Sequence, residues 1–111
     1  MTIQELFAQL SVKVLCEGEP EREICRGVTG DLLSFIMGSA PESAAWVTIL
    51  GHLNVVAVAV LRGIPCIIVA AGKTPDPQMV SRCIQEGIAL GVSEESAFSL
   101  CARMGALGLK G

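Results

Sequence analysis

The sequence has few charged and few aromatic side chains. Charged residues make up 17% of its 111 positions, and it contains one Trp, one His and no Tyr. The formal net charge of −3 excludes the basic excess with which many proteins bind nucleic acid. No basic, Ser-rich or signal-like segment stands at the N-terminus, so we expect a cytoplasmic protein.

The five cysteines lack the spacing of a disulfide framework or a metal site. Their number is odd, no CxxC pair occurs, and the single His is not near any of them in sequence. Cys66, Cys83 and Cys101 fall on predicted apolar faces, where Cys acts as a small hydrophobe. The four glutamates between Glu17 and Glu23 could hold a metal ion, but an exposed, flexible loop is the interpretation that we favour. We expect no metal and no cofactor.

No apolar run is long enough to cross a membrane. The longest apolar window, Leu53 to Ala71, is interrupted by Asn54, Arg62, Gly63 and Pro65, so that neither piece spans a bilayer core of ~30 Å. Apolar residues nevertheless make up 51% of the chain. This fraction suggests a buried self-association surface and hence a homodimer, although a sheet covered on both faces would also consume apolar residues.

The segment from Ile64 to Val92 predicts a strand, a turn, a helix and a second strand. Pro65 to Ala70 is a short apolar run rich in β-branched residues, typical of a strand buried on both faces. Gly72 permits a turn, Thr74 followed by Pro75 indicates a helix start, and Gly87 indicates the helix end. The helix has one apolar stripe, formed by Met79, Val80, Cys83, Ile84 and Ile88. Strands joined in this way pair in parallel with a right-handed crossover.

The remaining segments extend this unit. A capping box of Thr2 and Glu5 begins a short N-terminal helix, and Ser93 is predicted to cap the last helix. Strands are predicted at Val12 to Cys16, Ile24 to Thr29 and Ala45 to Leu50, with a helical turn or two from Leu32 to Met37. Residues 1–111 are therefore predicted to form one three-layer α/β/α domain with a mostly parallel sheet of about four or five strands.

The segment from Leu53 to Leu61 has two interpretations. Its four valines favour a strand, which would form a hairpin with the strand before it. Against this, Asn54 can cap a helix and Gly63 can end one. A crossover helix is also required if the strands on either side run in parallel. We predict a helix.

Most of the chain from Gly27 onward resembles the DRTGG domain family and its relative, the N-terminal domain of HPr kinase/phosphorylase. The resemblance rests on PCIIVAAGKTPDPQMVSRCIQEGIAL followed by VSEESAF, and upstream on GVTGDLLS and WVTILGHLNVVAVAVLRG, which are similar to stand-alone members. The pentapeptide that names the family is absent, and the corresponding region reads GSAPESAA. The resemblance implies an α/β/α domain, a non-catalytic regulatory or sensory role beside a catalytic or nucleotide-sensing partner, and a dimer. The catalytic half of HPr kinase, with its phosphate-binding loop, has no counterpart in this sequence.

A ligand site is predicted beyond the carboxyl ends of the strands, where open α/β sheets bind ligands. Gly72, Lys73 and Thr74 resemble the end of a phosphate-binding loop, but Ile67 stands where the full pattern needs Gly, so ATP hydrolysis is disfavoured. The loop after the preceding strand is expected to converge on them if both loops end on one side. The predicted ligand-binding residues are Thr48, Gly51, His52, Asn54, Gly72, Lys73 and Thr74. The alternatives are a solvated turn at Gly72 and a helix cap at Asn54.

We therefore hypothesise a regulatory or sensory domain, not an enzyme, that binds a partner protein or a small anionic, nucleotide-like ligand. The alternative is a purely structural homodimeric module. A small enzyme using His52 and Asp31 is disfavoured, because His52 lacks an orienting carboxylate in sequence and a turn or cap explains Asp31 equally well. Ser34 has no base near it in sequence, so we exclude a nucleophilic triad.

Overall fold

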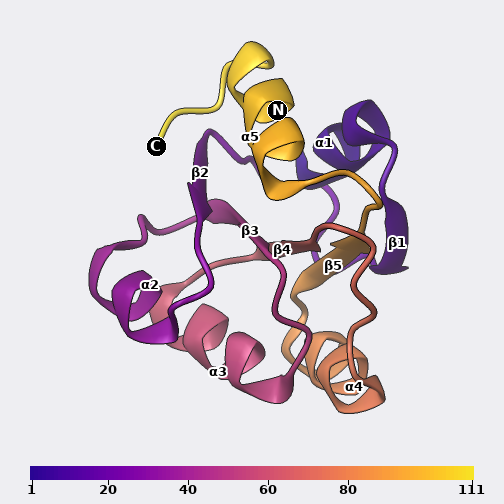
Figure 1. Ribbon diagram of the computed structural model, residues 1–111, viewed down its shortest axis with the longest axis vertical. Coiled ribbons are helices and arrows are strands. Elements are labelled where there is room, and N and C mark those ends of the chain that lie inside the picture. The colour runs from indigo at the N-terminus through magenta and orange to yellow at the C-terminus, as the bar shows by residue number, and fades with distance from the viewer.

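The computed structural model describes residues 1–111, in which five helices and five strands alternate along most of the chain (Figure 1). The elements are α1 (Ile3–Leu10), β1 (Lys13–Cys16), β2 (Arg26–Thr29), α2 (Leu33–Ser39), β3 (Ala44–Thr48), α3 (Leu53–Arg62), β4 (Cys66–Val69), α4 (Pro77–Glu86), β5 (Ala89–Val92) and α5 (Ala97–Ala106). Each predicted element is present, with bounds that differ by a few residues.

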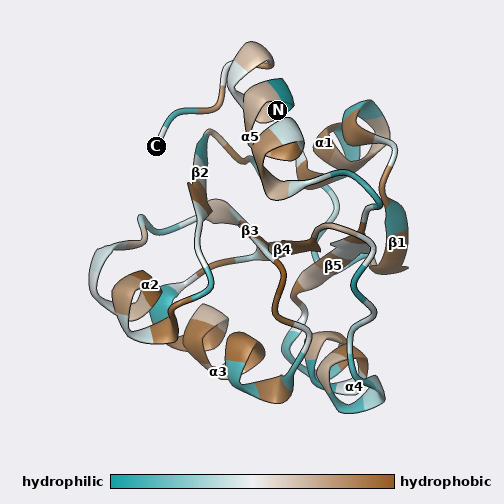
Figure 2. Cartoon of the chain, viewed as in Figure 1, coloured by the Kyte–Doolittle hydropathy of each residue, from teal (hydrophilic) through white to brown (hydrophobic).

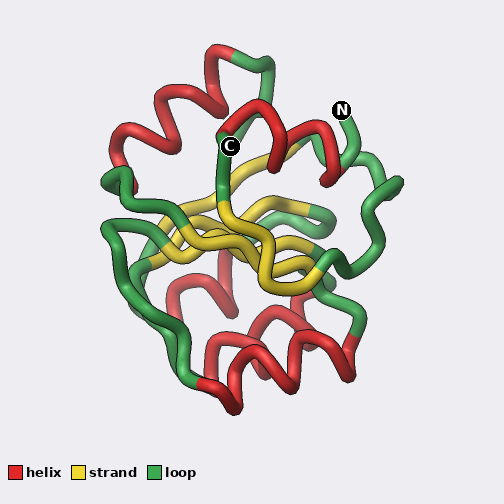
Figure 3. Tube along the Cα trace, turned by 90° about the vertical axis from the view of Figure 1, so that its right-hand side faces the viewer, coloured by secondary structure: helices red, strands yellow, loops and turns green.

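The five strands form one mostly parallel sheet in the order β1-β5-β4-β3-β2. Strands β2 to β5 are parallel neighbours in chain order, and only β1 is antiparallel, at the β5 edge. Because every right-handed crossover then turns the same way, α2, α3 and α4 cover one face of the sheet. Helices α1 and α5 cover the other face, which gives the predicted three-layer α/β/α architecture (Figures 1 and 3).

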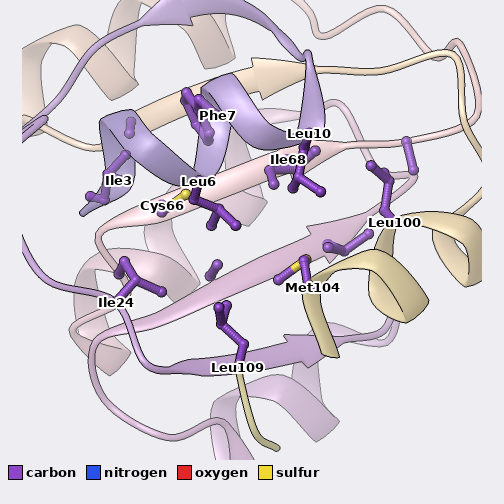
Figure 4. Close-up of a cluster of buried hydrophobic side chains, with 14 residues drawn as sticks. Ile3, Leu6, Phe7, Leu10, Ile24, Cys66, Ile68, Leu100, Met104 and Leu109 are labelled. Carbon is purple, nitrogen blue, oxygen red and sulfur yellow. The ribbon is translucent and has the colours of Figure 1, made fainter. Parts of the chain in front are cut away.

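Alternate residues of the central strands supply the two cores. Val47 of β3 and Ile68 of β4 pack with α1 and α5, whereas Trp46 and Ile67 pack with α2, α3 and α4. All residues of β3 and β4 are buried, and β4 is brown in the hydropathy colouring (Figure 2). Figure 4 shows the α1 and α5 core, in which Leu6 of the first helix faces the strands. The doubly covered sheet thus buries part of the apolar content, while several large apolar side chains, among them Phe35, Leu61 and Phe98, remain exposed.

The ambiguous segment is helix α3, as predicted, and tertiary context overrides the strand propensity of its valines. Gly63 ends it in the left-handed conformation, as Gly87 ends α4. The predicted N-cap was wrong, however. His52 occupies the cap position without a side-chain hydrogen bond, and Asn54 lies exposed in the first turn.

Two further cap predictions were wrong, whereas the capping box at Thr2 and Glu5 is confirmed. Helix α4 is preceded by Asp76 rather than Thr74, with Pro77 as its first residue. Helix α5 is capped by Ser96, whose hydroxyl accepts the Ser99 amide at 3.1 Å. In both places the cap position lies two or three residues after the predicted one.

The helices are at most 10 residues long. None of them is both long enough and apolar enough to cross a bilayer.

Candidate functional site: a cleft at the carboxyl edge of the sheet

The loops after β2, β3, β4 and β5 meet at one edge of the sheet, because these four strands are parallel. The antiparallel strand β1 begins at the same edge, since Lys13 is paired with Val92, the last residue of β5. The N-terminal segment thereby contributes to an edge that otherwise consists of loops from the C-terminal two-thirds.

The loops after β4 and β5 diverge to opposite faces of the sheet, one to α4 and the other to α5. Such a point of divergence is where open α/β sheets form a crevice. Here backbone hydrogen bonds join the two loops: the Ala71 amide donates to Glu95 O at 2.7 Å, and the Gly72 amide donates to Ser93 O at 2.9 Å. The Lys73 amide donates to Ala70 O at 3.2 Å. These amides are therefore not free to cradle a phosphate, and any anion at this turn would be bound by side chains.

A cleft of about 480 Å³ lies beside this junction, between the two loops and the start of β1. Its charged and hydroxyl-bearing lining residues include Lys13, Lys73, Thr74, Ser93, Glu94 and Glu95. Neither lysine forms an ion pair, and Glu94 forms none either. The cleft thus presents two cations and a carboxylate without intramolecular partners.

Glu95 differs from its neighbour because it is held in a network. Its carboxylate pairs with the guanidinium of Arg103 on α5 and accepts the Ser99 hydroxyl at 2.8 Å. Arg103 also donates to the Gln9 carbonyl at 2.7 Å, at the C-terminal end of α1. This network fixes one wall of the cleft to both helices on that face of the sheet.

Several polar side chains in and beside the loops after β2 and β3 are hydrogen-bonded within the chain. The Asp31 carboxylate accepts the Thr48 hydroxyl at 2.8 Å and the Ile49 amide at 2.9 Å. Thr48 is 1% exposed, and its hydroxyl oxygen also accepts the Leu50 amide at 3.2 Å. The indole of Trp46 donates to the Gly30 carbonyl at 3.0 Å. Thr48 and Asp31 therefore link two loops.

The expected convergence of the two predicted loops is only partly present. The Gly51 carbonyl accepts the Asp76 amide at 2.7 Å, and a methyl group at Gly51 would lie 3.0 Å from Thr74 O and from Pro75 Cα. The loops therefore touch through their backbones. Of the predicted site residues, Gly72, Lys73 and Thr74 line the cleft, whereas Thr48, Gly51, His52 and Asn54 do not.

The sequence prediction did not include Lys13, Ser93 and Glu94. Ser93 and Glu94 follow a predicted strand and carried the same positional signal as Gly72. Lys13 carried no such signal, because it stands at the start of its strand. Only the antiparallel pairing of β1 with β5 brings the start of β1 to this edge.

The structure brings together no group of three or more His, Cys, Asp or Glu side chains that could hold a metal ion. Cys66 and Cys83 are buried, as their apolar faces predicted. Burial raises the pKa of the Cys66 thiol, and burial together with the nearby Cys16 raises that of Cys83 to about 12. Neither thiol is ionised at neutral pH, so neither can act as a nucleophile without rearrangement.

Neither the family models nor the curated proteins contain a match to this sequence. Among solved structures, the chain is similar to the CBS and DRTGG domains of the regulatory region of Clostridium perfringens pyrophosphatase, solved with its activator diadenosine tetraphosphate. The TM-score is 0.71 at 13% sequence identity, and the alignment covers 93% of this chain and 45% of that one. The similarity shows a shared fold, and the chain spans less than half the length of its neighbour.

Proposed function

We propose that the chain is a DRTGG-like regulatory domain that binds a small anionic, nucleotide-like ligand in the carboxyl-edge cleft without turning it over. Two independent lines support the proposal. The sequence resembles the DRTGG family, and the structural neighbour is named as a regulatory region with CBS and DRTGG domains and a nucleotide activator. The aligned part of that neighbour is, in this proposal, its DRTGG domain.

The observation that carries the proposal is the pair of unpaired lysines in the cleft. Lys13 and Lys73 approach it from β1 and from the loop after β4, and an anion between them would gain two charge-assisted contacts. Thr74 and Ser93 add hydroxyl groups, and the Glu94 carboxylate can accept hydrogen bonds from sugar hydroxyls. Among the predicted residues, the ligand contacts are assigned to the side chains of Lys73 and Thr74, and Gly72 forms the turn that carries them. Gly51 supports their loop.

A thermal-shift panel of nucleotides and phosphorylated metabolites tests the proposal. At least one compound is expected to raise the melting temperature, and the shift should fall sharply in Lys73→Ala and Lys13→Ala because each removes one cationic contact. Lys110→Ala is the matched control, because Lys110 is exposed and lies outside the cleft. A panel without any shift, or shifts that persist in both cleft variants, would exclude this site.

A second candidate function, a homodimeric interaction module, is favoured by the outer surface of α2 and α3. Leu61 is 71% exposed and Phe35 is 58% exposed. The only charged residue of the two helices is Arg62, whose guanidinium donates to the Ala40 carbonyl. Helix α3 is predominantly brown in Figure 2, whereas α4 carries teal segments. A second copy could cover this surface without like-charge repulsion.

Sedimentation equilibrium tests the second candidate. If the module is a homodimer, Leu61→Glu should shift it toward monomer, because a charge would be buried at the interface. The control is Phe98→Glu, because Phe98 is 85% exposed on α5, on the opposite side of the sheet. A wild-type chain that stays monomeric at high micromolar concentration would eliminate the dimer and leave the ligand proposal unaffected.

A further inference from the structure

Strand β1 leaves one edge of the sheet without a partner strand. It pairs with β5 on one side only and is the last strand in the sheet order. Figure 3 looks onto this side of the molecule, and the strand lies between the two helical layers with no segment in front of it. Backbone amides and carbonyls along such an edge are a template for another strand. Its pairing with β5 is irregular between Val14 and Cys16, which limits the regular template to a few residues.

An apolar groove of about 420 Å³ runs beside this edge, between α1 and β1. Ile3 and Phe7 form its buried floor, with 1% and 4% of their surface exposed. Ala8 on the helix and Val14 on the strand form its exposed walls, and Val14 is 45% exposed. A strand added to β1 would place every second side chain on the α1 side of the sheet, which is the side of the groove.

The groove has an acidic end. Glu17 lines it, and Glu21 follows in the same exposed loop. Neither of these glutamates is in an ion pair, whereas Glu19 pairs with Arg22 and Glu23 pairs with the N-terminal amine. The loop therefore has unpaired negative charge next to an apolar groove, which complements a basic side chain.

We propose that the β1 edge binds an extended peptide segment of another protein, which adds a short strand to β1. The peptide places an apolar side chain in the groove between α1 and β1 and a basic side chain beside Glu17. Main-chain hydrogen bonds give this mode its affinity, and pockets for alternate side chains give it specificity. The groove shares only Ser11 with the lining of the carboxyl-edge cleft, whereas Lys13 and Leu15 of β1 also line that cleft. The proposal does not depend on a ligand in the cleft.

Fluorescence polarisation with a defined probe tests the proposal. The probe is a fluorescein-labelled decapeptide in which Val and Thr alternate and the last two residues are Arg. Val14→Lys and Ala8→Arg are each expected to weaken binding by about tenfold or more, because they fill or charge the groove. Ala8→Arg leaves the strand itself intact.

Glu17→Lys is expected to weaken binding of this probe and to improve binding of a probe ending in two Glu. Ile84→Lys, on α4 across the sheet, is the control that should bind normally.

Hydrogen exchange supplies the second readout. Bound peptide should protect amides within Lys13–Cys16 and leave those of α3 unchanged, which a nonspecific apolar contact would not do. Equal binding of a composition-matched probe without alternation, or normal binding by Val14→Lys and Ala8→Arg, overturns the proposal. A chain that self-associates and becomes monomeric in Val14→Lys also overturns it, because the occupant of the edge would then be a second copy.

Discussion

The two halves of the carboxyl edge differ in which of their polar side chains are paired within the chain. In the half formed by the loops after β2 and β3, a carboxylate, a hydroxyl and an indole hydrogen-bond to the chain itself. In the half formed by the loops after β4 and β5 and by β1, two lysines and Glu94 have no ion-pair partner. Both halves lie at strand ends, so position in the fold does not by itself distinguish a structural residue from a binding residue.

The difference indicates where binding capacity remains. Polar groups that are hydrogen-bonded within the chain stabilise it and would have to break those bonds to meet a ligand. Thr48 is such a group, since its hydroxyl both donates to Asp31 and accepts the Leu50 amide. Lys73 is the contrasting group, because its side chain is exposed at the cleft and its loss would leave no buried partner unsatisfied.

The largest expected effect of this contrast is on stability. Asp31→Ala should lower the free energy of unfolding by about 2 kcal/mol, because hydrogen bonds to a charged acceptor are lost and the buried Thr48 hydroxyl loses its acceptor. Lys73→Ala should change it by less than about 0.5 kcal/mol, as for other exposed sites. Urea denaturation of the two variants measures the difference. Equal losses would show that the two halves are not distinct in this way.

The sequence was sufficient to predict the parallel sheet and its crossovers. Helix α3 illustrates the reason: its valines favour a strand locally, but parallel neighbours on both sides require a crossover helix. The helix ends were also predictable at Gly87, because the left-handed conformation favours glycine. The starts at Thr74 and Ser93 were wrong, since several consecutive residues there can cap and only tertiary contacts select among them. The Ser93 hydroxyl in fact accepts the Glu95 amide at 3.1 Å.

Lys13 was beyond prediction for a different reason. Local patterns place residues after a strand, but they do not give the direction of an isolated strand such as β1 or its position in the sheet. Lys13 reaches the cleft only because β1 pairs antiparallel with β5. Thr48 illustrates a second limit, because its position at a strand end does not reveal that its hydroxyl is hydrogen-bonded to Asp31.

An intermediate effect is expected at the turn that forms the open half. Gly72 has φ +69°, and a methyl group there would lie 2.5 Å from Glu94 Oε2. The flexible carboxylate can move, so Gly72→Ala should displace Glu94. This variant should lower the free energy of unfolding by about 1 kcal/mol, mainly because of the left-handed backbone.

Ala71 already has φ 60° in the same turn, and Ala71→Gly is the control. We expect the free energy of unfolding of Ala71→Gly to lie within about 0.5 kcal/mol of the wild-type value. Relief of backbone strain in the folded state opposes the added entropy of the unfolded chain. Urea denaturation and the ligand-induced thermal shift report the two consequences separately.

The smallest expected effect tests whether the open half is a preformed cleft or a loose segment. Helix α4 follows the loop that carries Lys73, and Cys83 is buried within this helix. The Cys83 pKa of about 12 keeps the thiol protonated at neutral pH. In a preformed cleft, iodoacetamide should modify the exposed Cys25 rapidly and Cys83 only at the rate of global unfolding. Peptide mapping by mass spectrometry follows both thiols.

The pH dependence has a definite sign. The pKa of Cys83 lies above its ordinary value of 9.0 in the folded state, so the unfolded chain loses this proton first as the pH rises. The contribution of the neutral thiol to stability is therefore intact below pH 9.0 and is lost progressively toward pH 12.

Rapid alkylation of Cys83 at neutral pH while Cys66 stays protected would show that α4 opens locally. Lys73, on the loop before α4, would then lie in a mobile segment, and its lack of a partner would reflect dynamics and not binding capacity.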